Sequence, residues 1–402
     1  MTLMAAFALT SVMMSAADEA PFCEAAMIFD PEAESHGHVH ASCVIECPNG
    51  DLRAVWYENG TPLPPPYYEG DQDKSADVRI GSARKPAGAA AWEAPFVITD
   101  TFGVSDNNPC LAIDRENRLW LVHATLLAVP ENAWGSGLVH YHVSADYDAP
   151  GVPKWLKENI LAVHPHGFVE AMMAPFDAKA KDRDYPESMR EKSLKRIQDR
   201  MKDPLKCRLG WMPRAHPLIR SDGAVVVPLA NENYGLSAMA ITGDGGNTWT
   251  IGNAVPGAGL IQPTVVEFPD GLMLAFFRNG NPANRIMRSE SRDGGMNWTP
   301  PVLTDLLHPG SGIEAVLLKN GHLLMIYNDT ERDPRDHLAV SISEDRGATW
   351  SRTRHLETTP GGRFDYPSLV QAKDGSLHAT YSYNLKTIKH VHFNEAWVQQ
   401  GD

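Results

Sequence analysis

The chain is poor in cysteine and has none of the close spacings by which cysteines hold a metal. Five cysteines are spread over 402 residues, and no Cys-x-x-Cys pair occurs among them. Cys43 and Cys47 lie four residues apart on a predicted strand, about 13 Å at the rise of an extended chain, which is too far for a disulfide. The odd number leaves at least one thiol free. We expect buried thiols that pack as small apolar side chains, and the sequence predicts no metal and no cofactor.

Positive charge is also scarce. The formal net charge is −14, and no basic stripe is present that could neutralise phosphates, so the sequence argues against a nucleic-acid partner. The same charge gives no general attraction for an anionic sugar, and a site for such a sugar would need a few local arginines. No apolar run reaches the length of about 18 residues that a membrane-spanning helix needs.

The amino terminus has the composition of a targeting segment. Residues 1–17 are apolar and end in small residues before Asp18 and Glu19. They resemble a signal peptide, although the usual basic residue at the start is missing. We expect a secreted or periplasmic protein whose residues 18–402 form a single domain. A poorly ordered tail or a misassigned start codon is the alternative interpretation.

The chain does contain three copies of one short pattern, Ser/Thr-x-Asp-x-Gly-x-x-Trp. The copies begin at Thr242, Ser291 and Ser343, about every 50 residues, and such a period is typical of a repeat architecture. The Asp carboxylate can accept backbone N–H groups and the Gly can adopt a positive φ. The pattern therefore predicts a tight turn between antiparallel strands, with the Trp packed against the neighbouring sheet.

This pattern is similar to the Asp-box of sialidase-like β-propellers, and the chain resembles that family. The resemblance implies an all-β propeller fold. Six hairpin signals, each with two apolar runs around an Asx turn, predict six blades. The final blade is one strand short, and we expect residues 25–29 to complete it and hide both sheet edges. The hairpin turns lie at Asn49, Asn117, Asp222, Asp270, Asn320 and Asp374.

One stretch, at about residues 154–206, breaks the repeat between the second and third hairpins. It is dense in charge and in helix-forming residues, with apolar side chains at Met189, Leu194, Ile197 and Met201. This spacing predicts a helical insertion between blades 2 and 3. We expect it to be a surface cap rather than a separate domain.

Polar residues stand at the start of each hairpin. The innermost strand of a propeller blade begins beside the central channel, so these positions are expected to surround one pocket. The alternative is that they only fill the channel with hydrogen bonds. The positions are His40, Asn107 or Asn108, Arg214 or His216, Gln262, Glu314, and Asp365 or Tyr366.

The family resemblance implies roles for several of these residues. Retaining sialidases use a tyrosine nucleophile assisted by a glutamate, an aspartate acid/base and three arginines that hold the substrate carboxylate. Tyr366-Pro-Ser-Leu369 is similar to the nucleophile motif Tyr-x-x-Leu, and Arg278 in Phe-Phe-Arg-Asn matches one arginine. The segment from Asp73 to Asp77 is similar to the acid/base segment, which makes Asp73 the expected acid, with Asp77 and Glu69 as alternatives. We expect Tyr366, Asp73 and Glu314 to be catalytic, and His40, Asp77, Asn108, Arg214, His216, Gln262, Arg278 and Asp365 to bind the substrate.

Three positions depart from the family pattern. The first blade has His40-Ala-Ser where the family has Arg-Ile-Pro, Gln262 stands where a Glu is expected, and no arginine begins the fifth blade. A neutral amide cannot be a general base, so strict sialidase activity is not expected. The sequence predicts an exo-acting glycoside hydrolase that acts on a terminal sugar, acidic or neutral, of a glycan. The alternatives are a polysaccharide lyase that uses a His/Tyr pair beside an arginine-neutralised uronate, and a non-catalytic glycan-binding propeller.

Overall fold

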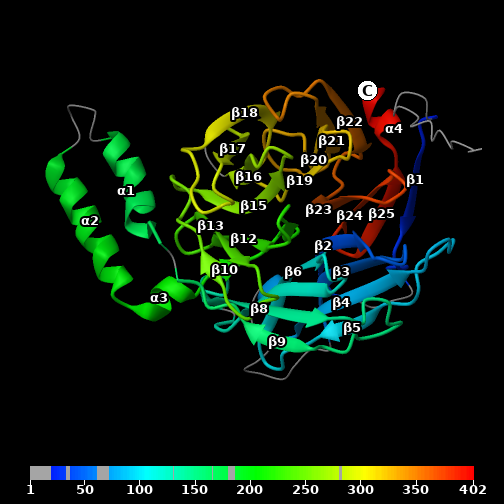
Figure 1. Ribbon diagram of the computed structural model, residues 1–402, viewed down its shortest axis with the longest axis horizontal. Helices are drawn as coiled ribbons and strands as arrows, with labels where there is room; N and C mark the ends of the chain where they lie inside the picture. Colours follow the sequence, from blue (N-terminus) through cyan, green and yellow to red (C-terminus); the bar gives the residue numbers. More distant parts are fainter. Residues whose placement is uncertain are drawn as a thin grey trace, which may run out of the picture.

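Six antiparallel sheets surround a common centre in the computed structural model (Figure 1). The structure describes residues 20–32, 37–60, 72–129, 131–164, 166–179, 186–279 and 283–402. The predicted signal peptide at residues 1–17 and Glu69 lie outside these ranges. The sheets succeed one another along the chain as the blades of a propeller, which confirms the predicted six-bladed, all-β fold.

The strands of blades 1 to 5 pair from the axis to the rim. Blade 1 consists of β2 (Val39–Glu46), β3 (Leu52–Asn59), β4 (Val78–Lys85) and β5 (Phe96–Thr99). Blade 2 consists of β6 (Ser105–Ile113), β7 (Leu119–Leu126), β8 (Gly137–Ser144) and β9 (Lys157–Ile160). Blade 4 consists of β15 (Leu260–Glu267), β16 (Met273–Asn279), β17 (Arg285–Ser291) and β18 (Val302–Leu307). Blade 5 consists of β19 (Glu314–Leu317), β20 (Leu323–Asn328), β21 (Leu338–Ser343) and β22 (Arg352–Glu357).

Blade 3 differs because its innermost strand is interrupted. The two pieces, β10 (Trp211–Met212) and β11 (Leu218–Ile219), both pair with β12 (Val225–Asn231). The blade continues outward through β13 (Leu236–Thr242) and β14 (Thr250–Ile251). The residues between the two pieces, which include Arg214 and His216, are therefore free of the ladder and lie beside the axis.

Blade 6 is closed by the amino-terminal strand. It contains β23 (Phe364–Gln371), β24 (Leu377–Tyr383) and β25 (Thr387–Phe393), and β1 (Cys23–Met27) pairs with β25 on its outer side. The pairing runs from Cys23 opposite Phe393 to Met27 opposite Lys389. Closure of the last blade by a strand near residues 25–29 was predicted and is confirmed, and it ties the two ends of the chain together (Figure 1).

All three Asp-box patterns form the turn between the third and fourth strands of a blade. In blade 4, Asp293 accepts hydrogen bonds from the Ser291 hydroxyl and the Asn297 backbone N–H, each of 2.9 Å. The same arrangement recurs at Asp244 in blade 3 and at Asp345 in blade 5. The boxes lie on the outer side of the sheets, away from the axis.

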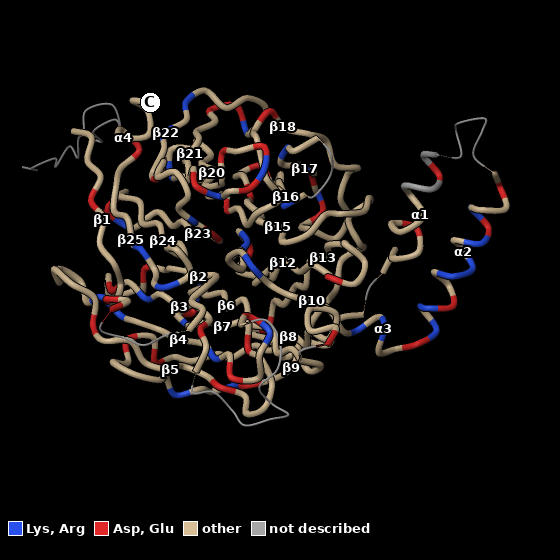
Figure 2. Tube along the Cα trace, turned by 180° about the vertical axis from the view of Figure 1, so that it is seen from behind, with Lys and Arg blue, Asp and Glu red and all other residues tan. Residues whose placement is uncertain are grey.

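The predicted helical insertion between blades 2 and 3 is present. It contains α1 (Phe168–Lys179), α2 (Glu187–Met201) and α3 (Pro204–Arg208), which project from one side of the propeller (Figure 1). Ile197 of α2 is buried, whereas Met189, predicted on the same apolar face, is 56% exposed. Lys, Arg, Asp and Glu residues alternate along most of α2 (Figure 2). A last short helix, α4 (Glu395–Gln399), follows blade 6.

The apolar core lies between neighbouring blades. One cluster joins Trp120 and Tyr141 of blade 2 to Leu229 and Leu236 of blade 3. All five cysteines lie in the described ranges as free thiols, and all except Cys23 are buried. Within those ranges, the structure contains no helix whose length and apolar character would let it cross a membrane.

Candidate active site

Four innermost strands share an unusual backbone feature close to their first residues. Each has a β-bulge with one residue in the left-handed region, with φ of 54° at Ala41, 51° at Asn108, 50° at Gln262 and 49° at Tyr366. A bulge changes the direction of a side chain locally, and non-glycine residues with such φ values are held there by the surrounding fold. These four blades therefore each present one side chain in an equivalent manner.

The register also fixes which residue holds the equivalent position in each blade. The left-handed residue lies nine positions before a turn residue with positive φ, as Tyr366 lies before Gly375. By this count the position in blade 1 belongs to Ala41 rather than to the predicted His40. In blade 5 it belongs to Gly312 rather than to Glu314, and in blade 3 it belongs to Arg214.

A cavity of about 260 Å³ opens at this end of the innermost strands, and we call it the front cavity. Its walls come from the first residues of innermost strands, the ends of second strands and two loops, one of them carrying the short 3-10 helix η2 (Gln72–Lys74) and the other η3 (Trp134–Ser136). The structure brings six predicted residues together here, namely His40, Asp73, Asn108, Gln262, Arg278 and Tyr366. The other lining residues are Lys74, Trp134, Glu232, Ile261, Arg335 and Arg363.

The phenol of Tyr366 lies in a hydrogen-bonded group with Arg278 and Gln262. The Arg278 guanidinium donates to the Tyr366 oxygen at 2.7 Å and to the Gln262 carbonyl oxygen at 3.2 Å. The Gln262 amide also donates to the Tyr366 oxygen at 3.3 Å. Two donors therefore converge on one phenol oxygen, an arrangement that stabilises negative charge on that atom.

The ring of Tyr366 is fixed by its neighbours. The His40 ring meets it edge-on with 4.3 Å between centroids, and the Arg214 guanidinium lies 4.9 Å from the ring centroid. Arg214 is buried and donates to the Pro367 carbonyl at 2.6 Å, so it acts behind the tyrosine and not on the cavity surface. A side chain at Gly312 would bring its Cβ to 3.1 Å from the ring, so the glycine permits this close approach.

Asp365 lies behind the cavity and is held by two arginines that the sequence analysis did not identify. Arg335 donates to one carboxylate oxygen at 2.8 Å and Arg363 donates to the other. Burial would raise the pKa of Asp365, but the positive charges of Arg335 and Arg363 outweigh it and lower the pKa. The carboxylate is thus ionised and positions both guanidinium groups at the cavity wall.

Two carboxyl groups line the cavity itself. Asp73 is positioned through its backbone carbonyl, which accepts from the Asn107 amide at 2.9 Å. Glu232, which follows β12, was not among the predicted residues. Burial raises the pKa of Glu232, while Arg278 opposes the shift. In the part of the chain that the structure describes, the Glu232 carboxylate has no hydrogen bond or ion pair, so it is available to a ligand.

His40 is neutral in the folded protein. Burial lowers its pKa well below the ordinary value, although Asp365 opposes the shift. Its Nδ1 lies 3.0 Å from the Ser382 hydroxyl. The ring therefore contributes shape and a neutral hydrogen-bonding edge to the cavity rather than a positive charge.

Glu314 and His216 lie in a second cavity, which we call the back cavity. It has a volume of about 290 Å³ and is lined by β11 and β19 and by the later residues of β15 and β23, beyond the bulges. Glu314 accepts from the His216 backbone N–H at 2.9 Å and from the Leu369 N–H at 3.0 Å, and the His216 ring lies 2.7 Å from it. The other ring nitrogen of His216 donates to the Val44 carbonyl at 2.8 Å. The pair joins the innermost strands of four blades.

The electrostatics of this pair favour two charged groups. Burial lowers the pKa of His216, but Cys43 and Glu314 outweigh it and raise the pKa well above the ordinary value. Burial likewise acts to raise the pKa of Glu314, and His216 and Arg214 more than offset it.

The remaining predicted residue, Asp77, is buried beside Asn59 and Ser75 and does not line the front cavity. Among the described residues no group of three His, Cys, Asp or Glu side chains could hold a metal ion.

Comparisons with known proteins agree with this architecture. Residues 200–379 match the family model for the BNR repeat-like domain. A sialidase from Paraclostridium sordellii is 31% identical over 133 residues, which are 29% of this chain and 32% of that protein, so the match spans about a third of the relative.

Two solved structures share the fold, each with a TM-score of 0.65. One, from Dyadobacter fermentans, is described as a protein of unknown function, is 17% identical and covers 92% of this chain and 98% of its own. The other is the intramolecular trans-sialidase from Ruminococcus gnavus, which is 14% identical, with coverage of 92% and 97%.

Proposed function

We propose that this chain, a sialidase-like β-propeller with BNR repeats, is an exo-acting glycoside hydrolase that removes a terminal acidic sugar from a glycan. The observation that carries the proposal is the hydrogen bond of 2.7 Å from Arg278 to the phenol oxygen of Tyr366 at the wall of a small, arginine-lined cavity. A tyrosine oxygen that receives donors from an arginine and an amide is prepared to carry negative charge, as a nucleophile must.

The size and charge of the front cavity support a single acidic sugar as its ligand. Its volume of about 260 Å³ lies at the small end of ligand pockets, which suits one terminal residue rather than an internal stretch of a chain. Arg278, Arg335 and Arg363 line it in a protein with a net charge of −14. Guanidinium groups bind carboxylates through paired hydrogen bonds, so a sugar acid is the class of ligand that these arginines would recognise.

The carboxyl groups supply the proton transfers. Gln262 cannot accept a proton from Tyr366, and we assign that role to Glu232, whose raised pKa makes its carboxylate a stronger base than an ordinary glutamate. Asp73 is our candidate for the acid at the leaving group. Glu314 is removed from this set, since its partners in the back cavity use both of its oxygens.

The proposed reaction has two steps. First, Tyr366 gives its proton to Glu232 and its oxygen attacks the anomeric carbon, while the glycosidic bond breaks and the leaving oxygen takes a proton from Asp73. Then water attacks the anomeric carbon and gives a proton to Asp73, the bond to Tyr366 breaks, and the phenolate recovers its proton from Glu232. Arg278 stabilises the phenolate in both steps through its N–H group.

A panel of fluorogenic glycosides tests the proposal. Methylumbelliferyl glycosides of N-acetylneuraminate, glucuronate and glucose are incubated with the wild-type protein and with Tyr366→Phe. We expect release from at least one acidic glycoside and none from the glucoside, and release should depend on Tyr366. No release from either acidic glycoside above the level of Tyr366→Phe would contradict the proposal.

A polysaccharide lyase is the second candidate, and the contact between His40 and Tyr366 favours it. Their ring centroids lie 4.3 Å apart, and burial keeps His40 neutral, which is the form that can accept a proton. In this reaction the arginines would neutralise a uronate carboxylate while His40 removes the adjacent proton. The ultraviolet absorbance of an unsaturated uronate product would identify the lyase. Binding of a sugar acid without any product would instead support a non-catalytic glycan-binding propeller.

A further inference from the structure

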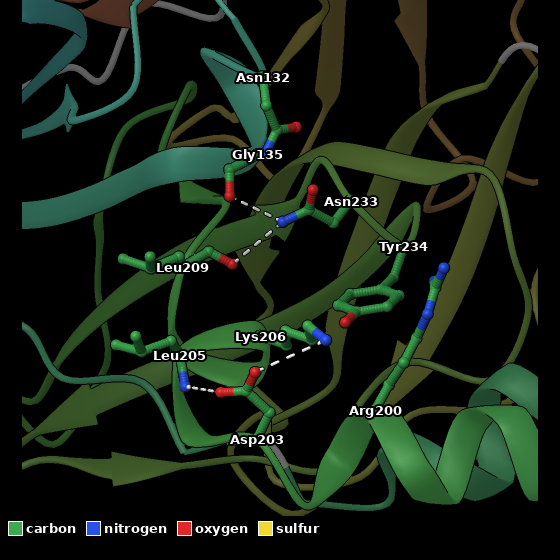
Figure 3. Close-up of a pocket in the computed structure, with 9 residues that line it drawn as sticks. All are labelled: Asn132, Gly135, Arg200, Asp203, Leu205, Lys206, Leu209, Asn233 and Tyr234. Carbon is green, nitrogen blue, oxygen red and sulfur yellow. Dashed lines mark hydrogen bonds and ion pairs between the residues drawn. The ribbon is translucent and has the colours of Figure 1, made fainter.

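Another hollow, besides the front and back cavities, lies between the helical insertion and the propeller, and we call it the insertion pocket (Figure 3). Its volume is about 500 Å³. Arg200 from α2, Asp203, and Lys206 from α3 form its outer wall, and Asn132, Asn233 and Tyr234 from the loops of blades 2 and 3 form its inner wall. The pocket exists only because the insertion departs from the propeller repeat.

The insertion pocket shares a wall with the front cavity. Trp134 and Glu232 line the front cavity, and the residues that follow them, Gly135 and Asn233, line the insertion pocket. The Asn233 amide donates to the Gly135 carbonyl at 2.8 Å and so joins the two loops that form this wall (Figure 3). The second sugar of a glycan whose terminal sugar occupies the front cavity would therefore reach the insertion pocket across Trp134 and Glu232.

The chemistry of the pocket suits a sugar with an acidic group. The ring of Tyr234 is held edge-on by Phe168 at 4.8 Å between centroids, and Arg200 lies 5.8 Å from the ring centroid. Lys206 is 3.6 Å from Asp203, whose other oxygen accepts from the Leu205 N–H at 3.1 Å. Among the described residues no carboxylate pairs with Arg200. The pocket thus has one positive charge in excess, next to an aromatic ring and two amides.

We propose that the insertion pocket binds the sugar next to the one removed and selects a carboxylate or sulfate on it through Arg200 and Lys206. This inference rests on the proposed function, because it takes the terminal sugar to occupy the front cavity. It assigns the substrate to glycans that carry acidic groups on two successive sugars. It also gives the helical insertion a role in specificity rather than only a structural one.

The test compares two disaccharides by isothermal titration calorimetry. The probes are glucuronyl-N-acetylgalactosamine with and without a 6-sulfate on the second sugar. We expect the sulfated form to bind the Tyr366→Phe protein, which cannot use the proposed nucleophile, about fivefold more tightly, as an accessible ion pair allows. Arg200→Ala should remove this preference without a change in affinity for the unsulfated form. Arg196→Ala is the matched control, since Arg196 is an exposed arginine on the same helix that does not line the pocket.

All titrations use the Tyr366→Phe background, which lacks the proposed nucleophile, so the readout is affinity even if the wild type hydrolyses the disaccharide. A sulfate preference that Arg200→Ala removes, in a protein that hydrolyses no glycoside, would keep the subsite and reject the hydrolase. Equal affinity for the two disaccharides, including no measurable binding of either, would overturn the subsite. An equal loss of preference in Arg196→Ala would also overturn it, because the effect would then reflect the general charge of α2. Lys206→Ala provides a second variant if Arg200→Ala disturbs the packing on Tyr234.

Discussion

The front and back cavities lie at opposite ends of the same innermost strands and differ in what their polar groups contact. In the back cavity, both oxygens of Glu314 and both ring nitrogens of His216 have protein partners. In the front cavity, the Glu232 carboxylate has none among the described residues, and three guanidinium groups face the hollow. The charged pair of the back cavity joins blades together. In the front cavity, the Glu232 carboxylate and the guanidinium N–H groups not bound to Asp365, Tyr366 or Gln262 are left for a ligand.

This difference shows that a buried charge on a propeller axis is not by itself a sign of catalysis. Glu314 is more completely buried than any carboxylate that lines the front cavity, and its hydrogen bonds cross between strands of different blades. A buried ion pair of this kind is costly to break because each partner leaves an uncompensated charge behind. The residues that act on a ligand are those whose hydrogen-bonding capacity the fold has not already used.

The largest expected effect comes from the front cavity. Tyr366→Phe removes the oxygen on which Arg278 and Gln262 converge, and we expect turnover of an acidic glycoside to fall by about 1,000-fold or more, because no nucleophile remains. The measurement is kcat/KM on the glycoside that the wild type cleaves.

Arg278→Lys is the control for this variant. It keeps the charge and loses the planar pair of donors, so binding should weaken more than turnover. Unchanged activity in Tyr366→Phe would contradict the assignment of catalysis to the front cavity, because this cavity would then hold no nucleophile. The protein would have to work by another mechanism or by binding alone.

The second largest effect is expected in the back cavity, where a substitution should lower stability and leave activity unchanged. Glu314→Gln leaves His216 without its carboxylate and turns one acceptor that faces the Leu369 N–H into a donor. We expect the free energy of unfolding to fall by about 3–5 kcal/mol, as measured by denaturant titration. The folded fraction of the variant should retain its kcat/KM. A well-folded Glu314→Gln protein without turnover would place Glu314 in the catalytic machinery and contradict the division between the two cavities.

Glu232→Gln examines whether the unpartnered carboxylate of the front cavity acts as the base. We expect kcat/KM to fall by about 100-fold, since the amide cannot accept the tyrosine proton. The raised pKa of Glu232 also fixes the direction of the pH dependence. Wild-type activity should be lost as the pH falls through this pKa, because the protonated carboxyl is no longer a base, and the variant should lack this acidic limb.

Glu232→Asp is the conservative control. It should retain part of the activity and the loss of activity at low pH. An acidic limb that persists unchanged in Glu232→Gln would assign it to another group, of which Asp73 is the first candidate.

The fold was predictable because its signals are local and repeated. An Asx turn between apolar runs, and an Asp-box before the fourth strand, each specify a hairpin without reference to the rest of the chain. The strand Cys23–Met27 could be assigned to blade 6 because that blade was one strand short. The interruption between β10 and β11 and the exposure of Met189 were not predicted, since both depend on how the insertion meets the propeller.

The site was predictable only as far as the repeat extends. Repeat position placed His40, Asn108, Gln262 and Tyr366 at the front cavity, and the family resemblance added Asp73 and Arg278. In blade 1 the left-handed residue is Ala41, one place after the predicted His40, although His40 does line the cavity. In blade 5 the predicted Glu314 lies two places after the equivalent Gly312 and lines the back cavity instead. Glu232, Arg335 and Arg363 come from loops and strand ends outside the repeated pattern, and only tertiary packing brings them to the cavity.

The smallest effect is expected at the rim of the propeller. There the carboxylate oxygens of the Asp-boxes, like those of Glu314, accept hydrogen bonds from the protein itself. Asp293 accepts from the Ser291 hydroxyl, the Asn297 backbone N–H and the Asn297 amide. Asp293→Ala removes these acceptors on an exposed turn, where water can replace part of them, so we expect a loss of about 1 kcal/mol in the free energy of unfolding. Arg292→Ala, in the same turn with its side chain 65% exposed, is the matched control and should change stability little. Both variants should keep the wild-type kcat/KM. A folded Asp293→Ala protein without turnover would show that the rim contributes to catalysis, and the contrast between internally partnered and ligand-facing carboxylates would then fail.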